Sequence, residues 1–504
     1  MKIYALVLFL SSVGLFSQTQ IGQDIFGESS LDYSGGPGYY STYANNAVSL
    51  SSDGTTVAVG ATGNDDNGAE SGHVRIYKNE FGVWTQVGQD IDGEAAGDLS
   101  GYSVSLSNDG TIVAIGATGN DGSGLLSGHV RIYNYNNTSN IWVQMGQDIH
   151  GESSGDASGF SIDLSSDGNI IAIGAPNNNL GGSIFRAGHT RIYMYHETTN
   201  TWQQIGDDID GIQDYYGFGR SVSLSDNGSI IAIGAFEGGV NNPNNFGHVK
   251  IYKNIANTWI QVGNTIIGEN PNDESGWSVS LSSDGTHVAI GAPHNDGGTG
   301  LNLSLGHIRI FSYSEVSDSW NQIGQDIDPV TPERSFGTCV SLSSNGSIVA
   351  VGTGTGHVRV LYYDEVSNSW NQVGATISDP PYYFGKSISL SSDGSKLAIG
   401  AAFYDNGTVN ACGKVEVYDL SQALSTNEFL ASQFALYPNP TKGKLSIRLD
   451  RGLELKKVTL CNGLGQQILT TTVPFIDTSD LSKGTYVVII ETNKGKSFKK
   501  IIID

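Results

Sequence analysis

The feature that most constrains this chain is an internal repeat. The leucine that closes an alternating Ser-x-Ser-Leu or similar pattern recurs seven times, at intervals of 48 to 61 residues. These leucines are Leu50, Leu106, Leu164, Leu224, Leu281, Leu342 and Leu390. Such self-similarity indicates one supersecondary unit repeated along the chain, in which neighbouring units bury a shared core.

Each repeat contains four strand-like segments. In the second repeat they are Ser103–Ser107, Ile112–Ala117, His129–Tyr133 and Trp142–Gly146. Asp-Gly or Asn-Gly joins the first segment to the second in all seven repeats, and this pair between alternating runs predicts a tight hairpin. The Ala and Gly positions of the second segment would let neighbouring sheets approach closely. Four-stranded sheets repeated seven times predict a β-propeller.

The two ends of the repeat region predict how the ring closes. The seventh repeat ends near Tyr418 without a Trp-x-Gln-x-Gly segment, and an unmatched fourth segment stands at the mature N-terminus, at Gln20–Ile25. The N-terminal strand is therefore expected to complete the last sheet, which removes the exposed edges of an open array. We expect an all-β protein whose residues 18–420 form a seven-bladed β-propeller closed by the N-terminal strand.

The repeats resemble the FG-GAP repeats of integrin α-chain propellers. The resemblance rests on Gly101–Val104, on the pairs Phe336-Gly337 and Phe384-Gly385, and on Gly174–Pro176 and Gly291–Pro293. It covers residues 18–420 and implies the propeller fold, which hosts many functions. The sequence departs from the family where the calcium loops of integrin-like repeats lie, because the first and second segments are joined only by a short turn. The family's calcium residues therefore have no counterpart at that place.

Residues 1–17 are expected to be a signal peptide. Lys2 is followed by the apolar stretch Ile3–Phe16, which is too short for a membrane span and suits an export signal. No other stretch is long and apolar enough to cross a bilayer. The three cysteines are too few for a disulfide framework, and a bridge between Cys339 and Cys412 stays open.

After a linker at residues 421–434, the chain changes character. Residues 435–504 hold more Lys and Arg than Asp and Glu, in contrast to the rest of the chain. Alternating apolar segments separated by Gly turns predict a small Ig-like β-sandwich of about seven strands.

Four motifs of this C-terminal segment resemble the type A sorting domain of the type IX secretion system of Bacteroidota. They are Tyr437–Pro440 with Gly443, then Asn462–Gln467, Leu481–Tyr486 and Lys499–Ile501. The sorting residues implied by the resemblance are Pro438, Asn439, Pro440, Gly443, Gly465, Lys483, Gly484, Tyr486, Lys499 and Lys500. The resemblance implies recognition by the outer-membrane secretion machinery, removal of the domain, and release or attachment at the cell surface.

Charge excludes one class of partner. The chain carries a formal net charge of −24 and has a pI of about 4.6. Nucleic acids and anionic membrane surfaces both require basic footprints, so neither is an expected partner.

Two recurring motifs raise the question of a metal. Six histidines share one repeat position, and we interpret them as repeated structural hydrogen bonds, because copies in a ring should lie more than ~10 Å apart. They are His73, His129, His189, His248, His307 and His357. The Asp-Ile-Asp-Gly-Glu text at Asp90, Asp92 and Glu94 offers weak calcium ligands, and turn chemistry is the alternative interpretation.

The loops predict a binding face. The connections between the second and third strands vary in length and emerge beside the connections between repeats, and variable loops on a rigid scaffold often bind ligands. The candidate ligand-binding residues are Asp65, Asp66, Asn120, Asp121, Asn295, Asp296, Tyr216 and Trp277. Acidic and amide groups beside aromatics suit a glycan, a cation or both, and solvated loops without a ligand are the alternative.

The sequence therefore predicts an exported cell-surface or extracellular binding or adhesion protein. Its partners would be the secretion machinery and a glycan or surface protein; no cofactor is required, and calcium stays open. A secreted enzyme acting on polysaccharide and a structural envelope component without a ligand are the alternatives. We expect no enzyme, because the Gly151–Gly155 match to G-x-S-x-G lies in a connection between repeats, where no nucleophile elbow forms.

Overall fold

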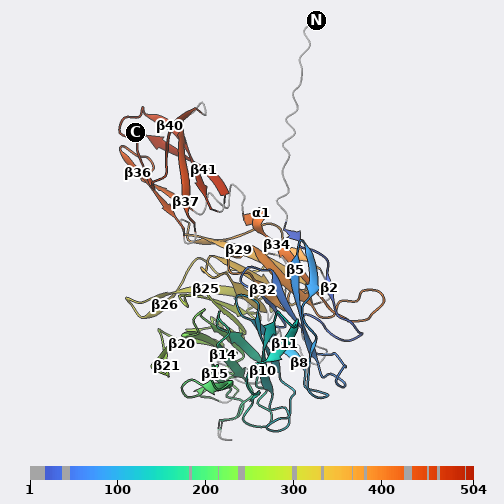
Figure 1. The fold of residues 1–504 in the computed structure, drawn as a ribbon. Coiled ribbons are helices and arrows are strands. Elements are labelled where there is room, and N and C mark those ends of the chain that lie inside the picture. The colour runs from blue at the N-terminus through green and yellow to red at the C-terminus, as the bar shows by residue number, and fades with distance from the viewer. Residues whose placement is uncertain are drawn as a thin grey trace.

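The computed structural model describes residues 18–36, 46–180, 184–213, 215–236, 245–297, 304–330, 334–365, 367–379, 383–424, 434–450, 453–462, 466–493 and 495–503. The expected signal peptide lies outside these residues. Within them, helix α1 (Ser421–Leu424) is the only helix, and strands form the rest of the regular structure (Figure 1). The expected all-β fold class is confirmed. No described helix has the length and apolarity needed to cross a membrane.

The repeats form seven antiparallel sheets, each a four-stranded meander, and in six of them the strands follow chain order. A further two-residue strand pairs with the third strand in most of them. The first sheet has β3 (Val48–Leu50), β4 (Thr56–Ala61), β5 (His73–Glu80), β6 (Val83–Gln86) and β7 (Ile91–Asp92). The second has β8 (Ser100–Leu106), β9 (Ile112–Ala117), β10 (His129–Asn136), β11 (Ile141–Gln144) and β12 (Ile149–His150). The third has β13 (Ser161–Leu164), β14 (Ile170–Ala175), β15 (His189–His196), β16 (Thr201–Gln204) and β17 (Ile209–Asp210).

The next three sheets repeat this plan. The fourth has β18 (Ser221–Leu224), β19 (Ile230–Ala235), β20 (His248–Ile255), β21 (Thr258–Gln261) and β22 (Ile266–Ile267). The fifth has β23 (Ser278–Leu281), β24 (His287–Ala292), β25 (His307–Ser314) and β26 (Ser319–Gln322). The sixth has β27 (Cys339–Leu342), β28 (Ile348–Gly352), β29 (His357–Asp364), β30 (Ser369–Gln372) and β31 (Ile377–Ser378).

The seventh sheet joins the two ends of the repeat region. Its strands are β32 (Ile388–Leu390), β33 (Lys396–Ala401), β34 (Lys414–Asp419), β1 (Thr19–Gln20) and β2 (Ile25–Phe26). The N-terminal strand β1 pairs antiparallel with β34, with Thr19 opposite Asp419. This is the pairing that the missing fourth segment of the last repeat predicts, and it leaves the sheet complete.

The innermost strands are linked into a closed ring by backbone hydrogen bonds. After each first strand, one N–H donates to the equivalent carbonyl of the next repeat at 2.8–2.9 Å, and the seventh bond returns to the first repeat. The ring runs through Ser52, Asn108, Ser166, Asp226, Ser283, Ser344, Ser392 and back to Ser52. The repeated leucine N–H groups form a second ring at 2.8–3.1 Å, each donating to a side-chain oxygen of the preceding repeat.

Glycine in the second strand permits the sheets to approach this closely. A Cβ at Gly116 would lie 2.2 Å from the carbonyl oxygen of Gly159 in the next sheet, a distance that no carbon tolerates. On the outer strands, the Trp142 indole donates to the Val87 carbonyl of the preceding repeat at 2.9 Å. The expected close approach at the Ala-Gly segments is therefore observed.

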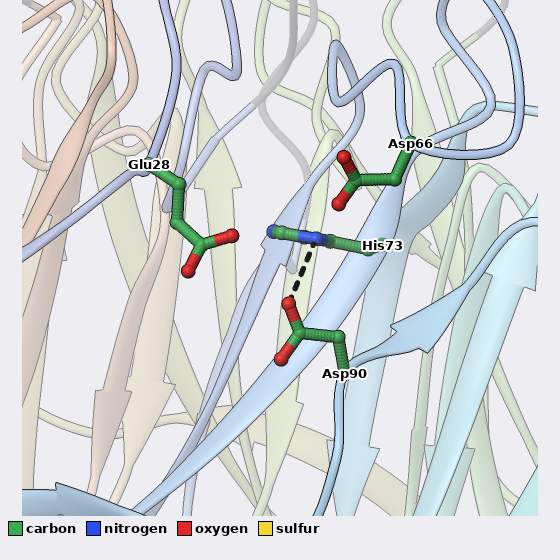
Figure 2. A group of neighbouring side chains, drawn as sticks. All are labelled: Glu28, Asp66, His73 and Asp90. Carbon is green, nitrogen blue, oxygen red and sulfur yellow. Dashed lines mark ion pairs between the residues drawn. The ribbon is translucent and has the colours of Figure 1, made fainter.

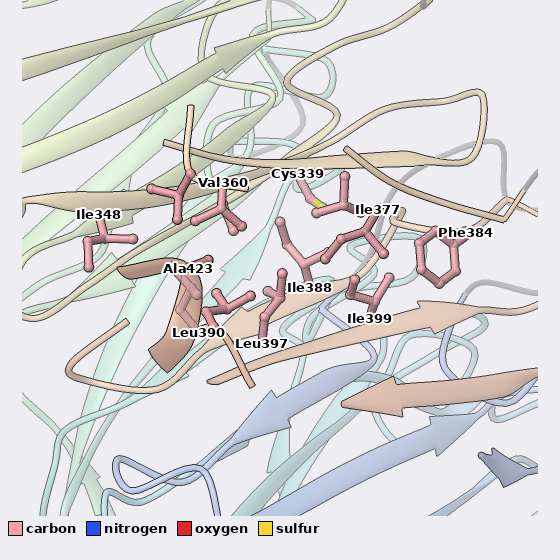
Figure 3. Packing of buried hydrophobic residues seen from close by; sticks show 14 of the residues in the cluster. Cys339, Ile348, Val360, Ile377, Phe384, Ile388, Leu390, Leu397, Ile399 and Ala423 are labelled. Atoms are coloured by element: carbon pink, nitrogen blue, oxygen red, sulfur yellow. The ribbon is translucent and has the colours of Figure 1, made fainter. Parts of the chain in front are cut away.

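Apolar side chains fill the space between consecutive sheets. Between the sixth and seventh sheets, Val360 and Ile348 face Ile388 and Leu397, and Ala423 of α1 covers the outer end of the cluster (Figure 3). The first four residues of the expected linker thus belong to the packed repeat domain, which we define as residues 18–424.

The three cysteines are all free. Cys339 stands where five of the other six repeats have serine, and its thiol donates to the Gly385 carbonyl with Sγ 3.0 Å from the oxygen. Cys412 contacts the Tyr404 carbonyl of its own loop instead. The disulfide between Cys339 and Cys412, which the sequence left undecided, is therefore not formed.

Residues 434–503, the C-terminal domain, form two sheets around one core. One sheet has β35 (Phe434–Tyr437), β36 (Lys444–Leu449) and β39 (Phe475–Asp477). The other has β37 (Leu455–Cys461), β38 (Gln467–Thr471), β40 (Gly484–Thr492) and β41 (Gly495–Ile503). The domain stands beside the seven sheets (Figure 1), and Arg448 bonds Glu365 of the repeat domain at 2.8 Å.

One bond of the second ring, in which leucine N–H groups donate to side-chain oxygens, has a different kind of acceptor. Six repeats supply a serine hydroxyl to the next leucine N–H, whereas the third supplies the Asp163 carboxylate, 2.8 Å from Leu224 N. Burial raises the pKa of the Asp163 carboxyl to about 6, although its hydrogen bonds lower it. An ionised carboxylate is therefore held in an unfavourable place at neutral pH.

We expect Asp163→Ser to stabilise the repeat domain by about 1–2 kcal/mol above pH 6. The pKa is higher in the folded state than in the unfolded chain, so wild-type stability falls as pH rises from about 4 to 6 and stays low above that window. Thermal unfolding at pH 4, 5, 6 and 8 measures this, with Asp163→Asn as the matched neutral variant. Parallel pH profiles for the wild type and both variants would contradict the assignment.

Candidate functional site

The strongest candidate site lies where the first strands begin. Each first strand runs toward its Asp-Gly or Asn-Gly hairpin. The residue four positions before the repeated leucine therefore lies at the opposite end of the ring. This one position holds seven different residues, which we call the axial mouth. They are Asn46, Tyr102, Phe160, Arg220, Trp277, Thr338 and Lys386.

A buried arginine is the centre of the axial mouth. Arg220 is 4% exposed, and its guanidinium carbon lies 4.6 Å from the Phe160 ring centroid and 4.3 Å from the Trp277 ring. Phe160 in turn packs against Tyr102, with ring centroids 5.1 Å apart. Four consecutive repeats thus contribute one continuous stack, in which a guanidinium lies between two aromatic faces.

Two cavities open at this stack. One, of about 400 Å³, is lined by five mouth residues including Arg220 and Trp277. The other, of about 490 Å³, shares Phe160 and Arg220 with the first and extends outward to Arg186 and Tyr215. Both volumes include open solvent; the enclosed space is about 30 Å³ in the first and about 90 Å³ in the second, so each is a small, shallow hollow.

The charge at the axial mouth is opposite to that of the whole chain. Arg220 and Lys386 are the two cations of the ring, and none of the described residues that line the two cavities is Asp or Glu. Lys386 is 8% exposed, and burial lowers the pKa of its ammonium to about 8. Its Nζ lies 4.2 Å from the Tyr383 ring centroid. In a chain of net charge −24, this mouth favours an anionic ligand.

The predicted loop residues do not gather in one site. Trp277 lies in the axial mouth, whereas Asn120 and Asn295 are buried and bonded within the scaffold. Asn120 donates to Asp98 at 3.2 Å, and Asn295 donates to Asp273 at 3.0 Å. These two amides fasten one loop to the next and serve the structure of the face.

The remaining loop candidates are spread around the ring. Asp65 and Asp121 play the same part in two repeats, because each carboxylate accepts a backbone N–H five residues later at 2.8 Å. Tyr216 packs on the His248 ring with centroids 4.8 Å apart. Asp66 lies beside His73, and Asp296 is half-buried in its own loop.

The three calcium candidates fall in separate places. Asp90 lies beside His73 of its own repeat, with Asp90 Oδ2 3.7 Å from His73 Nδ1, whereas Glu94 lies beside His129 of the next. Asp92 joins neither group; its backbone carbonyl accepts a hydrogen bond from Arg131. A single site made from Asp90, Asp92 and Glu94 is therefore not formed.

The structural interpretation of the repeated histidines is wrong for two of them. His73 and His129 are fully buried, and neither ring nitrogen of either residue has a hydrogen-bond partner. The reason is that the residues that face them are carboxylates at 3.7–3.9 Å, beyond hydrogen-bond distance.

The C-terminal domain exposes much of its sorting motif. Pro438, Asn439 and Pro440 are exposed, and Asn439 Oδ1 accepts the Ile502 N–H at 2.8 Å, which ties the motif to the last strand. Lys483, Gly484 and Lys500 are also exposed.

The other sorting residues have structural contacts. The Tyr486 hydroxyl donates to the Ser482 carbonyl at 2.9 Å, Lys499 lies over the Phe434 ring, and the Gly443 carbonyl accepts the Thr478 N–H. Gly465 lies outside the described residues.

Comparisons with known proteins identify the C-terminal domain. Residues 435–504 match the family model of the secretion system C-terminal sorting domain. The resemblance to type IX sorting domains is thereby confirmed, and the chain is a secreted or cell-surface protein of the Bacteroidota type that engages the type IX secretion machinery. No curated protein is significantly similar to the chain.

Two solved structures are similar to the repeat region at low identity. A candidate 6-phosphogluconolactonase from Bacteroides uniformis is 14% identical with a TM-score of 0.46, covering 67% of this chain and 87% of its own. The β-propeller domain of Cps50 (Swd1) from Myceliophteria thermophila is 12% identical with a TM-score of 0.46, covering 75% of this chain and 98% of its own.

Sequence reasoning missed Arg220, Phe160 and Lys386. A signal was present, because this residue differs in every repeat, although Gly precedes it in six repeats and Ser follows it in five. A variable position inside a uniform repeat indicates a place that the fold does not determine.

We expect removal of residues 435–504 to abolish secretion in a host with type IX machinery, because the sorting domain is the part that the machinery recognises. Immunoblots of culture medium, cell surface and periplasm measure this. Arg448→Ala, which breaks only the contact with Glu365, is the control and should be secreted like the wild type. Normal secretion of the truncated chain would contradict the prediction.

Proposed function

We propose that this protein is an exported binding protein that takes an acidic glycan at the axial mouth. In this proposal the seven sheets are the blades of a closed seven-bladed β-propeller with FG-GAP-like repeats, and the C-terminal domain is an Ig-like sandwich that directs the chain to the cell surface. The loop face that the sequence predicts as the binding face surrounds the mouth.

The stack of Phe160, Arg220 and Trp277 carries the proposal. A guanidinium recognises carboxylate or sulfate groups with two parallel hydrogen bonds, and aromatic faces pack against the apolar faces of sugar rings. The adjoining cavity supplies a second guanidinium from Arg186 and a ring from Tyr215. Cations beside aromatics suit uronic or sulfated sugars better than neutral ones.

Binding is better supported than hydrolysis at this place. Most glycosidases use two carboxyl groups about 5–10 Å apart on either side of the scissile bond. The described lining of both cavities offers no carboxyl group. The described residues of the mouth therefore have the groups to hold a saccharide, and none of them supplies the acid or base of that reaction.

The test is a binding screen of the full chain against matched acidic and neutral oligosaccharides. We expect selective binding of acidic members, weakened at least tenfold by Arg220→Gln. Asp121→Asn is the matched control, because it removes a charge from the same face outside the mouth and should leave binding unchanged. Equal binding of the neutral oligosaccharides, or an unchanged affinity in the Arg220→Gln variant, would contradict the proposal.

Lys386 adds a pH dependence to this binding. Burial lowers the pKa of the ammonium to about 8, so its positive charge is present at pH 7 and is lost as pH rises through 8. We expect affinity for an acidic oligosaccharide to fall severalfold between pH 7 and pH 9. Lys386→Arg, whose side chain stays charged, should remove the pH dependence, and a wild-type affinity that is constant over this range would refute the role of Lys386.

A further inference from the structure

A second constellation repeats around the ring, at the start of the third strands. In four repeats the first histidine of the third strand meets a glutamate from the preceding connection and an aspartate from its own sheet. Three of the sets are Glu28, His73 and Asp90; Glu152, His189 and Asp208; Glu269, His307 and Asp326. In the remaining set Glu94 and His129 are grouped with Asp98, and Asp148 Oδ2 lies 3.9 Å from His129 Nδ1. Figure 2 shows the first set, in which Asp66 is a fourth member.

The distances suit ligands that share one ion. The histidine Nδ1 lies 3.6–4.0 Å from at least one facing carboxylate oxygen in each set, and from two carboxylates around His129 and around His189. Two groups that each bind a metal at about 2.0–2.2 Å are separated by such a distance when an ion lies between them. In the first set, one ligand atom from each of Glu28, Asp66, His73 and Asp90 lies within 4.8 Å of the others.

The histidines point to a ligand independently of the carboxylates. All four are at most 2% exposed. His73 and His129 have no hydrogen-bond partner at either nitrogen, and His189 and His307 have none at Nε2. A buried polar atom without a partner costs roughly 1–3 kcal/mol, and a cation beside the carboxylates would remove that cost at Nδ1 of His73 and His129.

The seventh repeat places a cation in the equivalent position. Lys414 stands where the other repeats have histidine, and its ammonium lies 2.7 Å from Asp379, 2.6 Å from Glu416 and 4.0 Å from Asp24. Asp24 is the counterpart of Asp90 in the repeat text. The chain's own positive charge thus occupies the pocket between these carboxylates.

The remaining two repeats lose both carboxylates together. Around His248 the equivalent positions are Ile212 and Thr265, and around His357 they are Val330 and Thr376. In the six repeats with histidine, glutamate and aspartate are therefore present as a pair or absent as a pair, whereas the seventh repeat, with Lys414, keeps Asp24 and has Pro380 at the glutamate position. Ligands of one ion are useful only together, which agrees with the pattern around the histidines.

We propose that the four complete sets are divalent transition-metal sites of the zinc class, one at each of four junctions between neighbouring sheets. One imidazole nitrogen with two or three carboxylate oxygens matches the preference of such ions, whereas calcium prefers six to eight oxygens. Arg75 lies 3.0 Å from Glu28 Oε1, and Glu94 Oε1 lies 3.8 Å from Arg131 while its Oε2 faces His129, so an arginine positions each of these glutamates.

Each ion would connect two sheets. Glu94 follows β7 of the first sheet, whereas His129 and Asp148 belong to the second. In the first set, Glu28 follows β2, which pairs with β34 of the seventh sheet. That metal would therefore fasten the junction at which the N-terminal segment closes the ring. The sites are separate from the axial mouth, so the inference does not depend on the proposed glycan.

The test is titration of the full, chelator-treated chain with Zn²⁺, followed by isothermal calorimetry and by the visible absorption of a Co²⁺ substitute. We expect about four equivalents per chain and a higher unfolding temperature with metal, since binding to the folded state alone stabilises it. Glu94→Gln combined with Asp148→Asn keeps the side-chain shapes, so the variant should fold and bind one equivalent fewer.

His248→Ala is the matched control, because it removes a histidine of the same repeat position that lacks the carboxylates. It should leave the stoichiometry unchanged, whereas His129→Ala should lower it by one. Absence of Zn²⁺ binding, or the same stoichiometry in the Glu94→Gln, Asp148→Asn variant as in the wild type, would overturn the proposal. A loss of one equivalent in His248→Ala would also overturn it, because it would place the ion away from the carboxylates.

Discussion

The structure depends on the closed ring of backbone hydrogen bonds around its innermost strands. Seven bonds of 2.8–2.9 Å connect each repeat to the next, and the last, from Ser392 to Ser52, returns to the first. Such a ring requires the sheets to approach to backbone contact, which only glycine in the second strand allows. It also requires both chain ends in one sheet, because an unpaired β34 would leave an exposed edge. The core clusters between the sheets follow from this spacing.

A rigid ring of equivalent positions separates structure from function. The residues that hold the sheets together, such as the paired Gly116 and Gly159, hardly vary among the repeats. The position at the start of each first strand does not hold the sheets together, and there Phe160, Arg220 and Trp277 form a stack. Nearly all of the chain's excess negative charge lies elsewhere, so two buried cations at one mouth create a local field of opposite sign.

Local patterns predicted the strands, the hairpins and the partner of the N-terminal strand. They also predicted the sorting domain, because its motifs are contiguous in sequence. The same reasoning placed Asn120 and Asn295 in a binding face, where the structure makes them loop fasteners. It placed Asp90 and Glu94 together, although Glu94 reaches into the next repeat. Both errors have one cause: a short motif was assigned to a single unit, whereas each loop in this ring contacts its neighbour.

The sequence alone determined the number of repeats, the four strands of each, the offset that closes the ring and the C-terminal sorting domain. These follow from hydrogen-bonding and hydrophobic periods of a few residues, which a chain records directly. Only the tertiary structure decided that Arg220 lies between Phe160 and Trp277, and that His129 faces Glu94. Such residues are tens of positions apart, and their distance is set by the angle and spacing at which sheets pack. That geometry results from the closure of all seven sheets, and the sequence of a single repeat does not determine it.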